Sequence, residues 1–256
     1  MNKIETIQKK LANIEKEKGV KILYAAESGS RAWGFESDDS DYDVRFIYAQ
    51  PVEKYLQIQE TRDVIELPID GIWDINGWDL KKTLLLLHKS NSTLFEWGNS
   101  PLVYKTTDEW GKIKEIMNNY FLLKSGIWHY LSTAKSNYNE FLKDKEQIKL
   151  KKYFYCLRPI LASMWILNEQ TPPPMKFTEL VSAELDRDIL PFVEELLNLK
   201  MNSAETKFIS PVTQLNDYIE KNLVIMREKV ESLPHQKTLD FEELNEVFRG
   251  VLGVMQ

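Results

Sequence analysis

Asp41 and Asp43 stand one residue apart at the start of an apolar run, and a short polar loop separates them from a Gly29-Ser30 pair. Because strand side chains alternate, both carboxylates would point to the same face. Like charges held so close repel each other unless a cation lies between them. Mg²⁺ is such a cation, since it prefers oxygen ligands and substrate phosphates, and a Gly-Ser turn lets the backbone approach phosphates. The pattern therefore indicates metal-dependent phosphoryl transfer.

Composition narrows the classes of protein to which this chain can belong. With 256 residues and 43% apolar side chains, it can form one or two domains with a sizeable core. A net charge of -6 argues against an extended nucleic-acid surface, which is normally basic. The single cysteine, Cys156, lies in an apolar run and is expected to be a buried thiol. Without a signal-peptide pattern or an apolar run of about 18 residues, we expect a cytoplasmic protein with no membrane segment.

The first part of the chain combines helix and strand patterns. Apolar residues three and four apart predict a helix that ends near Gly19, with its buried face formed by Ile4, Ile7, Leu11 and Ile14. Strands are predicted at 21–26, 42–49, 62–67 and 72–75. Helical patterns follow from Asp79 and around 94–97.

From about residue 105 the strand signals fade and helical patterns take over. The predicted helices cover 108–118, 120–143, 147–168, 187–200, 211–231 and 240–252. We therefore predict an α+β protein, in which a small mixed-sheet domain at 1–105 is followed by an all-helical domain at 106–256.

A helix, a strand, Gly-Ser, a loop, an Asp-x-Asp strand and a further strand with an acidic residue follow one another in this chain. This order resembles the nucleotidyltransferase superfamily typified by DNA polymerase β and kanamycin nucleotidyltransferase. The phrases INGWDLKKTLLLL, FEWGNSPLVY, WHYLSTAKSNY and YFYCLRPILASMWIL are similar to the RNA-repair-pathway DNA polymerase β-like family. The resemblance spans nearly the whole chain and implies a polymerase β-like nucleotidyltransferase domain at 1–105.

The resemblance also implies an activity and its partners. An NMP would move from an NTP such as ATP to a hydroxyl acceptor, with pyrophosphate leaving. The acceptor would be an RNA end in RNA repair, and a functional association with an RNA ligase is implied, since members of that family are associated with such ligases. Two Mg²⁺ ions are expected as cofactors, with Mn²⁺ as a substitute.

Three carboxylates are expected to be catalytic and to hold these ions. Asp41 and Asp43 would bridge the metals, and a third carboxylate would hold the metal that activates the acceptor hydroxyl. Asp74 is our candidate for this role and for the general base, because it lies on a predicted strand between apolar neighbours. Glu66, Asp70 and Asp79 are competing candidates for the third carboxylate.

Gly29, Ser30 and Arg31 are the nucleotide-binding candidates next to this motif. By the resemblance, Gly29 and Ser30 would contact the triphosphate through backbone N–H groups and the Ser hydroxyl; an ordinary turn with a Ser cap is the alternative. Arg31 could bind a phosphate oxygen bidentately. It could equally pair with an acidic residue of the following loop, namely Glu36, Asp38 or Asp39.

Three cations of the second half are further nucleotide-binding candidates: Lys135, Lys152 and Arg158. Lys152 and Arg158 share part of one helix face with Lys151 and Tyr155. Arg158 lies in an apolar run, so its charge needs a partner, either a nucleotide phosphate or an internal carboxylate. Lys135 is the corresponding candidate on the preceding helix.

Two different functions are also compatible with the same pattern. The chain could be a non-catalytic NTP-binding regulatory module that keeps the fold, although its full set of three carboxylates argues against this. It could also be a nucleotidyltransferase that modifies a protein or a small molecule. The net negative charge favours such acceptors over long nucleic acids.

Overall fold

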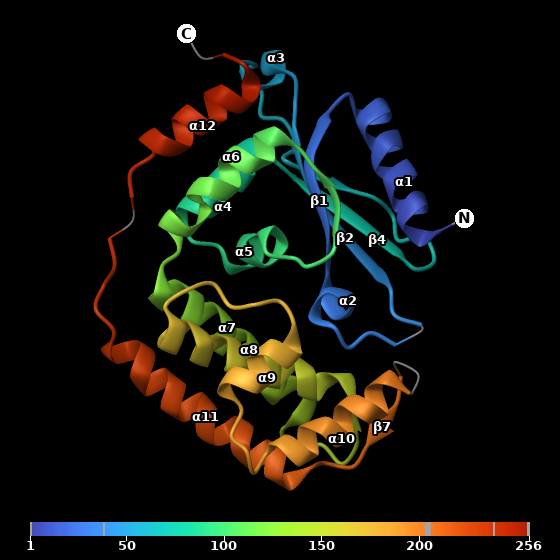
Figure 1. The fold of residues 1–256 in the computed structure, drawn as a ribbon, viewed down its shortest axis with the longest axis vertical. Helices are drawn as coiled ribbons and strands as arrows, with labels where there is room; N and C mark the ends of the chain where they lie inside the picture. Colours follow the sequence, from blue (N-terminus) through green and yellow to red (C-terminus); the bar gives the residue numbers. More distant parts are fainter. Residues whose placement is uncertain (1, 38, 203–205, 238, 255–256) are drawn as a thin grey trace. The chain divides into compact units, whose positions relative to one another are not determined.

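The computed structural model describes residues 2–37, 39–202, 206–237 and 239–254. Contacts within the chain divide it into two compact units. We call the first the sheet unit, formed by residues 1–32, 41–121 and 238–256, and the second the helical unit, formed by residues 33–40 and 122–237. Figure 1 shows the elements of both units.

A five-stranded mixed sheet forms the centre of the sheet unit (Figure 1). In the order β3-β4-β2-β1-β5, it contains β1 (Lys21–Ser28), β2 (Tyr42–Ala49), β3 (Val64–Glu66), β4 (Trp73–Asp79) and β5 (Val103–Thr106). β2 and β4 run parallel, whereas the other neighbouring strands are antiparallel. The first residues of β2 and β4 therefore meet at the same edge of the sheet.

Helix α1 (Lys3–Lys18) covers one face of this sheet (Figure 1). Its residues Ile7, Leu11 and Ile14 are buried in one core cluster with apolar side chains of β1, β2 and β4. The three-and-four spacing that predicted the helix is therefore the spacing of its buried face. Gly19 ends the helix as predicted, while Ile4 is largely exposed.

Helices α4 (Leu80–His88), α5 (Ser92–Gly98) and α6 (Asp108–Met117) lie on the other side of the sheet from α1 (Figure 1). Tyr24 of β1 connects the sheet with this layer. Its ring stacks on Trp110 with 4.4 Å between the centroids, and its hydroxyl donates to the Trp97 carbonyl at 2.9 Å. The last helix, α12 (Glu242–Leu252), packs on α4 and α6. Three short helices complete the sheet unit, namely α2 (Gly29–Trp33), whose last residue is counted in the helical unit, α3 (Val52–Tyr55) and η1 (Asn118–Tyr120).

The helical unit is built around α8 (Lys151–Glu169), whose residues are mostly buried. Its other helices are α7 (Leu123–Asn137), the π-helical turn η2 (Tyr138–Leu142), α9 (Phe177–Glu184), α10 (Leu190–Met201) and α11 (Thr213–Ser232). A two-residue strand pair also belongs to it, formed by β6 (Ile148–Lys149) and β7 (Phe208–Ile209). The described loop residues 34–37 and 39–40 belong to this unit, where the buried Lys200 ammonium donates to the Ser37 hydroxyl at 2.8 Å.

The predicted α+β class, with a small mixed sheet and a helical part, is confirmed. The sequence did not predict β5, α9 or the pair β6–β7, which adds strands to a part predicted as helical throughout. Residues 106–121 and α12 pack in the sheet unit, whereas the predicted boundary lies near 105; the domain division itself stays a prediction. Cys156 is buried, as expected. Among the helices in the described ranges, none is both long and apolar enough to cross a membrane.

Candidate functional site

β2 and β4 carry one aspartate each at the edge where both strands begin. Asp43, the second residue of β2, is paired in parallel register with Asp74, the second residue of β4. Their side chains are 29% and 33% exposed, so solvent reaches both carboxyl groups. The negative charge of Asp74 raises the pKa of Asp43, as expected for neighbouring carboxyl groups. The structure thus brings together two of the three carboxylates that the sequence predicts as metal ligands.

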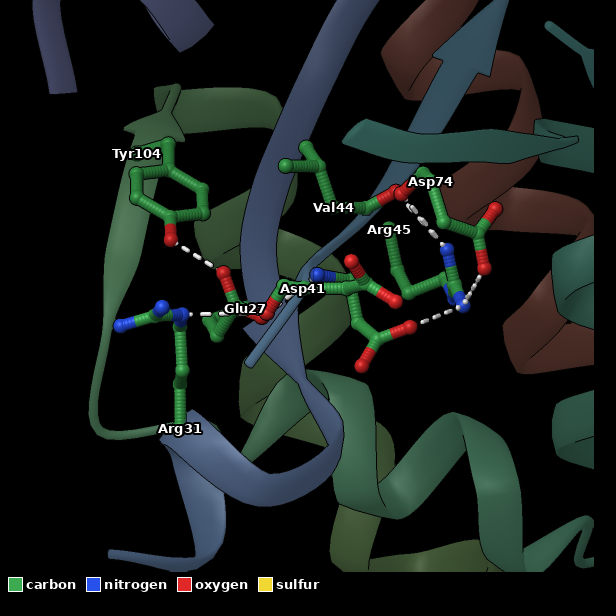
Figure 2. A network of polar contacts seen from close by, with 8 residues as sticks. Glu27, Arg31, Asp41, Val44, Arg45, Asp74 and Tyr104 are labelled. Atoms are coloured by element: carbon green, nitrogen blue, oxygen red, sulfur yellow. Dashed lines mark hydrogen bonds and ion pairs between the residues drawn. The ribbon is translucent and has the colours of Figure 1, made fainter. Parts of the chain in front are cut away.

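A cation already lies between these carboxylates, namely the guanidinium of Arg45 (Figure 2). Arg45 Nη2 donates to Asp43 Oδ1 at 3.0 Å and to Asp74 Oδ2 at 2.7 Å. Arg45 Nη1 donates to the backbone carbonyls of Asp74, at 3.0 Å, and Val44, at 3.3 Å. Sequence reasoning missed Arg45, although strand alternation places it on the same face of β2 as Asp43.

The surroundings of Asp43 disfavour its ionised form. Burial raises the pKa of this carboxyl group above its ordinary value. Arg45 lowers the pKa, whereas the negative charges of Asp74 and Asp41 raise it. The net shift is upward, so further positive charge at this place would stabilise the carboxylate.

Gly29 leaves room for the carboxylate of Asp43. Ser28, the last residue of β1, pairs with Asp43 in the antiparallel register, and Gly29 follows directly. The φ of Gly29 is +68°, in the left-handed region that favours glycine. A Cβ atom at this position would lie 2.2 Å from Asp43 Oδ2. Gly29 and Ser30 begin the short helix α2, and their contact with a triphosphate stays a prediction.

A fully buried carboxyl group, Glu27, supports Asp43 from the side of β1. Glu27 Oε1 accepts a hydrogen bond from the Asp43 backbone N–H at 2.7 Å, and Oε2 accepts one from the Tyr104 hydroxyl (Figure 2). Burial raises the pKa of Glu27 to about 7, although both hydrogen bonds lower it. Sequence reasoning missed Tyr104 because β5, the strand that carries it, was not predicted, and it missed Glu27, which directly follows the strand predicted at 21–26.

Asp41 lies just before β2 and is exposed. Its backbone carbonyl accepts a hydrogen bond from Arg31 Nε at 3.0 Å (Figure 2). The Arg31 guanidinium also lies 3.9 Å from the centre of the Tyr42 ring. Among the acidic loop residues that the sequence offers as partners of Arg31, Asp38 lies outside the described residues. Phosphate binding by Arg31 stays a prediction.

Asp79 competes with Asp74 for the role of third carboxylate, but it has different surroundings. It is the N-cap of α4, where it accepts hydrogen bonds from the Lys81 backbone N–H at 2.8 Å and the Tyr55 hydroxyl at 2.9 Å. The carboxyl group of Asp79 therefore caps the N-terminus of α4.

Glu66 and Asp70, which compete for the same role, lie in surface ion pairs. Glu66 pairs with Arg62, and Asp70 pairs with Lys10. Among the four candidates, Asp74 is the one paired in register with Asp43.

The cationic candidates of the second half lie in the helical unit. Arg158 is buried in α8, where its Nε donates to the Met175 carbonyl at 3.4 Å and its guanidinium lies 4.7 Å from the centre of the Trp33 ring. Lys152 lies over two aromatic rings, and burial lowers its pKa. Lys135 is exposed on α7. Nucleotide binding by these three residues stays a prediction.

Comparison with known proteins identifies the family of this chain. Residues 4–250 match the family described as the RNA repair pathway DNA polymerase beta family. The chain belongs to this family. The resemblance stated from the sequence is therefore confirmed, and the protein is nucleotidyltransferase-like.

Two proteins are similar to this chain, one at high and one at low sequence identity. Uncharacterized protein YcgL of Bacillus subtilis (strain 168) is 42% identical over 239 residues, which cover 92% of this chain and 91% of that protein. A nucleotidyltransferase-like protein from Exiguobacterium sibiricum 255-15, known from a crystal structure, has 13% identity and a TM-score of 0.32 over 88% of this chain and 75% of that chain. The second likeness is too weak to support a conclusion about fold or function.

The donor atoms at the start of β2 and β4 suit a hard cation. Asp43 and Asp74 offer carboxylate oxygens that solvent can reach. Within the part of the chain that the structure describes, no group of three or more His, Cys, Asp or Glu residues is arranged to hold a metal ion. Mg²⁺ nevertheless fits a pair, because it usually binds through one or two carboxylates together with waters and substrate phosphates. Metal binding by Asp41, Asp43 and Asp74 stays a prediction.

Proposed function

We propose that the protein is a Mg²⁺-dependent nucleotidyltransferase that moves an NMP from an NTP to a hydroxyl acceptor. One observation carries this proposal: Asp43 and Asp74 meet in register on neighbouring parallel strands, beside a glycine whose missing side chain leaves space for the Asp43 carboxylate. The name of the family supports RNA repair as the setting and an RNA end as the acceptor.

In the proposed reaction, the acceptor oxygen attacks the α-phosphorus of the NTP. The bond from this phosphorus to the oxygen that bridges to the β-phosphate breaks, and pyrophosphate leaves. Asp41, Asp43 and Asp74 would hold the divalent ions, and Asp74 would take the proton of the acceptor hydroxyl. Bound Mg²⁺ would supply positive charge against the negative charge that develops on the phosphate oxygens.

The turn after β1 would bind the triphosphate. Gly29 has no side chain, so phosphate oxygens could approach the backbone N–H groups there, and Ser30 would add its hydroxyl. The Arg31 guanidinium, which lies over the Tyr42 ring, would donate to a phosphate oxygen. In the helical unit, Lys135, Lys152 and Arg158 are the further candidates for contacts with the nucleotide.

A labelling experiment tests the proposal. The purified protein is incubated with Mg²⁺ and each α-labelled NTP, with tRNA, short RNA ends or cell lysate as acceptor. The wild type should move label to RNA only when Mg²⁺ is present. Asp43→Asn and Asp74→Asn should each lower turnover by more than about 100-fold, since residues that merely support metal ligands are typically worth roughly 10–100-fold.

Matched controls come from the surface of the same unit. Glu66→Gln and Asp70→Asn also remove one carboxylate each, but from exposed ion pairs, and should keep turnover. An Asp43→Asn variant with full turnover would contradict the proposed site. Label on protein or on a small molecule would contradict the RNA acceptor and leave the transferase reaction standing.

A non-catalytic NTP-binding module is the second candidate function. The position of Arg45 favours it, because the two carboxylates already have a cation between them. Such a module would bind NTP in a metal-dependent way and release no pyrophosphate. Measuring pyrophosphate release and NTP binding in the same mixtures separates the two functions.

A further inference from the structure

The hydrogen bonds of Arg45 fall into two groups (Figure 2). Nη2 serves the side chains, since it donates to Asp43 Oδ1 and Asp74 Oδ2 at 3.0 and 2.7 Å. Nη1 serves the backbone, since it donates to the carbonyl oxygens of Val44 and Asp74 at 3.3 and 3.0 Å. The side chain is 14% exposed, so its charge lies mostly within the site.

Nη2 uses carboxylate oxygens that a divalent ion would also need. Two carboxylates next to each other repel unless a positive charge lies between them. In this structure Arg45 supplies that charge, which explains how Asp43 and Asp74 can adjoin in the protein alone. The backbone bonds of Nη1 involve oxygens outside the carboxyl groups and need not break when a metal binds.

We propose that Arg45 is a positioning residue that holds Asp43 and Asp74 together before metal binds, and that it competes with the divalent ion for their oxygens. This inference rests on the proposed function, because it assumes that the two carboxylates are metal ligands. Each ion that binds must then displace the Nη2 bonds of Arg45. The protein therefore has a lower affinity for the metal than the bare carboxylate pair would have.

Removing Arg45 should consequently have two opposite effects. Without metal, the fold should become less stable, because the carboxylates lose their counter-ion. The affinity for a divalent ion should rise, because the competitor is gone. If Arg45 had a merely structural role, its removal would damage the site, and the affinity for the divalent ion would fall.

Mn²⁺ is the probe, because its binding can be followed by electron paramagnetic resonance and by calorimetry. We expect Arg45→Gln to lower the Kd for Mn²⁺ at least about tenfold, which corresponds to about 1.4 kcal/mol. Arg45→Lys keeps the charge but loses the planar fork, in which the backbone bonds of Nη1 hold Nη2 between the carboxylates. Its Kd should therefore lie between those of the wild type and Arg45→Gln. Arg62→Gln is the matched control, because it removes the same charge from an exposed pair with Glu66 and should leave the Kd unchanged.

A second measurement uses the wild-type chain and does not depend on a variant that folds. The side-chain N–H signals of Arg45 are followed by nuclear magnetic resonance while Mg²⁺ is added. They should shift, or exchange faster with solvent, when the Nη2 bonds break, whereas the signals of Arg62 should stay in place. Unchanged Arg45 signals at saturating Mg²⁺ would overturn the inference.

The outcomes separate this inference from the proposed function. If the wild type and Arg45→Gln bind Mn²⁺ equally well, or the variant binds more weakly, competition by Arg45 is wrong and the metal site remains. If only the variant binds Mn²⁺, competition is supported in its strongest form. If neither binds, both the inference and the metal dependence in the proposed function are wrong.

Discussion

Replacing Gly29 by alanine should destabilise the sheet unit in two separable ways. The first is backbone strain, because Gly29 has a φ of +68° and an L-residue in the left-handed region loses about 1–2 kcal/mol. The second is a collision, because the new Cβ would lie 2.2 Å from Asp43 Oδ2. The carboxylate must move, and we expect this movement to break the bond between its Oδ1 and Arg45. This ion pair is partly exposed, so we expect about 1–2 kcal/mol from its loss.

Gly71 provides a control that isolates the collision. Its φ is +62°, and a Cβ atom there would have nothing within 4 Å. Gly71→Ala should therefore show the strain alone, about 1–2 kcal/mol, whereas Gly29→Ala should lower the free energy of unfolding by about 2–4 kcal/mol. The difference between the two variants measures the displacement of Asp43.

Urea unfolding in the presence of EDTA, followed by circular dichroism, is the assay. In both variants the free energy of unfolding should fall with urea concentration at the same slope as in the wild type, so that the change in the midpoint of unfolding reports stability. Mn²⁺ affinity, measured on the folded proteins, should fall for Gly29→Ala, because the Cβ displaces the Asp43 carboxylate itself from its place beside Asp74, and stay unchanged for Gly71→Ala. Equal losses of stability and equal affinities in the two variants would refute the reasoning, because Gly29 would then matter for its backbone conformation alone.

Two further predictions concern buried carboxyl groups. Because burial raises the pKa of Glu27 from 4.5 to about 7, the free energy of unfolding should fall by about 3 kcal/mol as the pH rises through this window. Urea unfolding at about pH 5 and pH 8 should show that the free energy of unfolding falls less in Glu27→Gln than in the wild type. An equal fall in both proteins would contradict the raised pKa of Glu27. Asp79→Ala removes the α4 cap and the acceptor of the Tyr55 hydroxyl, so stability should drop by about 2–4 kcal/mol in the same assay. Turnover per folded molecule should be kept, and its loss would make Asp79 the third carboxylate.

The sequence predicts β2 with its observed bounds because the pattern there is local. Apolar and charged residues alternate from Tyr42 to Phe46, an apolar run continues to Ala49, and this pattern needs no knowledge of the neighbouring strands. The pairing of Asp43 with Asp74, in contrast, could not be predicted from a local pattern. It depends on β4 lying parallel to β2 in one particular register, which no local pattern specifies.

Three residues at the site were missed, for two different physical reasons. Arg45 could have been predicted, because strand alternation puts it on the same face as Asp43, but the cation expected between the carboxylates was a metal ion. Tyr104 could not be predicted from a local pattern, because β5 has four residues and becomes a strand through pairing with β1, which is far away in the sequence. The buried Glu27 shares this difficulty, since Tyr104 is one of its partners.

Arg158 shows the same limit within the helical unit. Its place in an apolar run predicts burial and the need for a partner, and it is buried. The sequence offered a phosphate or a carboxylate for that partner. The contacts that the structure provides include the Trp33 ring, at the end of α2, and the Met175 carbonyl, in the loop after α8. Such partners follow from tertiary packing, which a helical periodicity does not encode.

Asp43 combines features that stability alone would not produce. Its folded pKa is raised, so at neutral pH its ionised form makes the fold less stable than a neutral side chain would. Three neighbours nevertheless hold the carboxylate in place: Arg45 by an ion pair, Glu27 through the backbone N–H, and Gly29 by the lack of a side chain. Asp43→Asn removes the charge that burial disfavours and keeps an oxygen that can accept from Arg45. In EDTA, this variant should therefore unfold at a urea concentration at least as high as the wild type, although it should lose turnover. A clear loss of stability in that variant would mean that Asp43 serves the fold, and the proposed site would lose its main support.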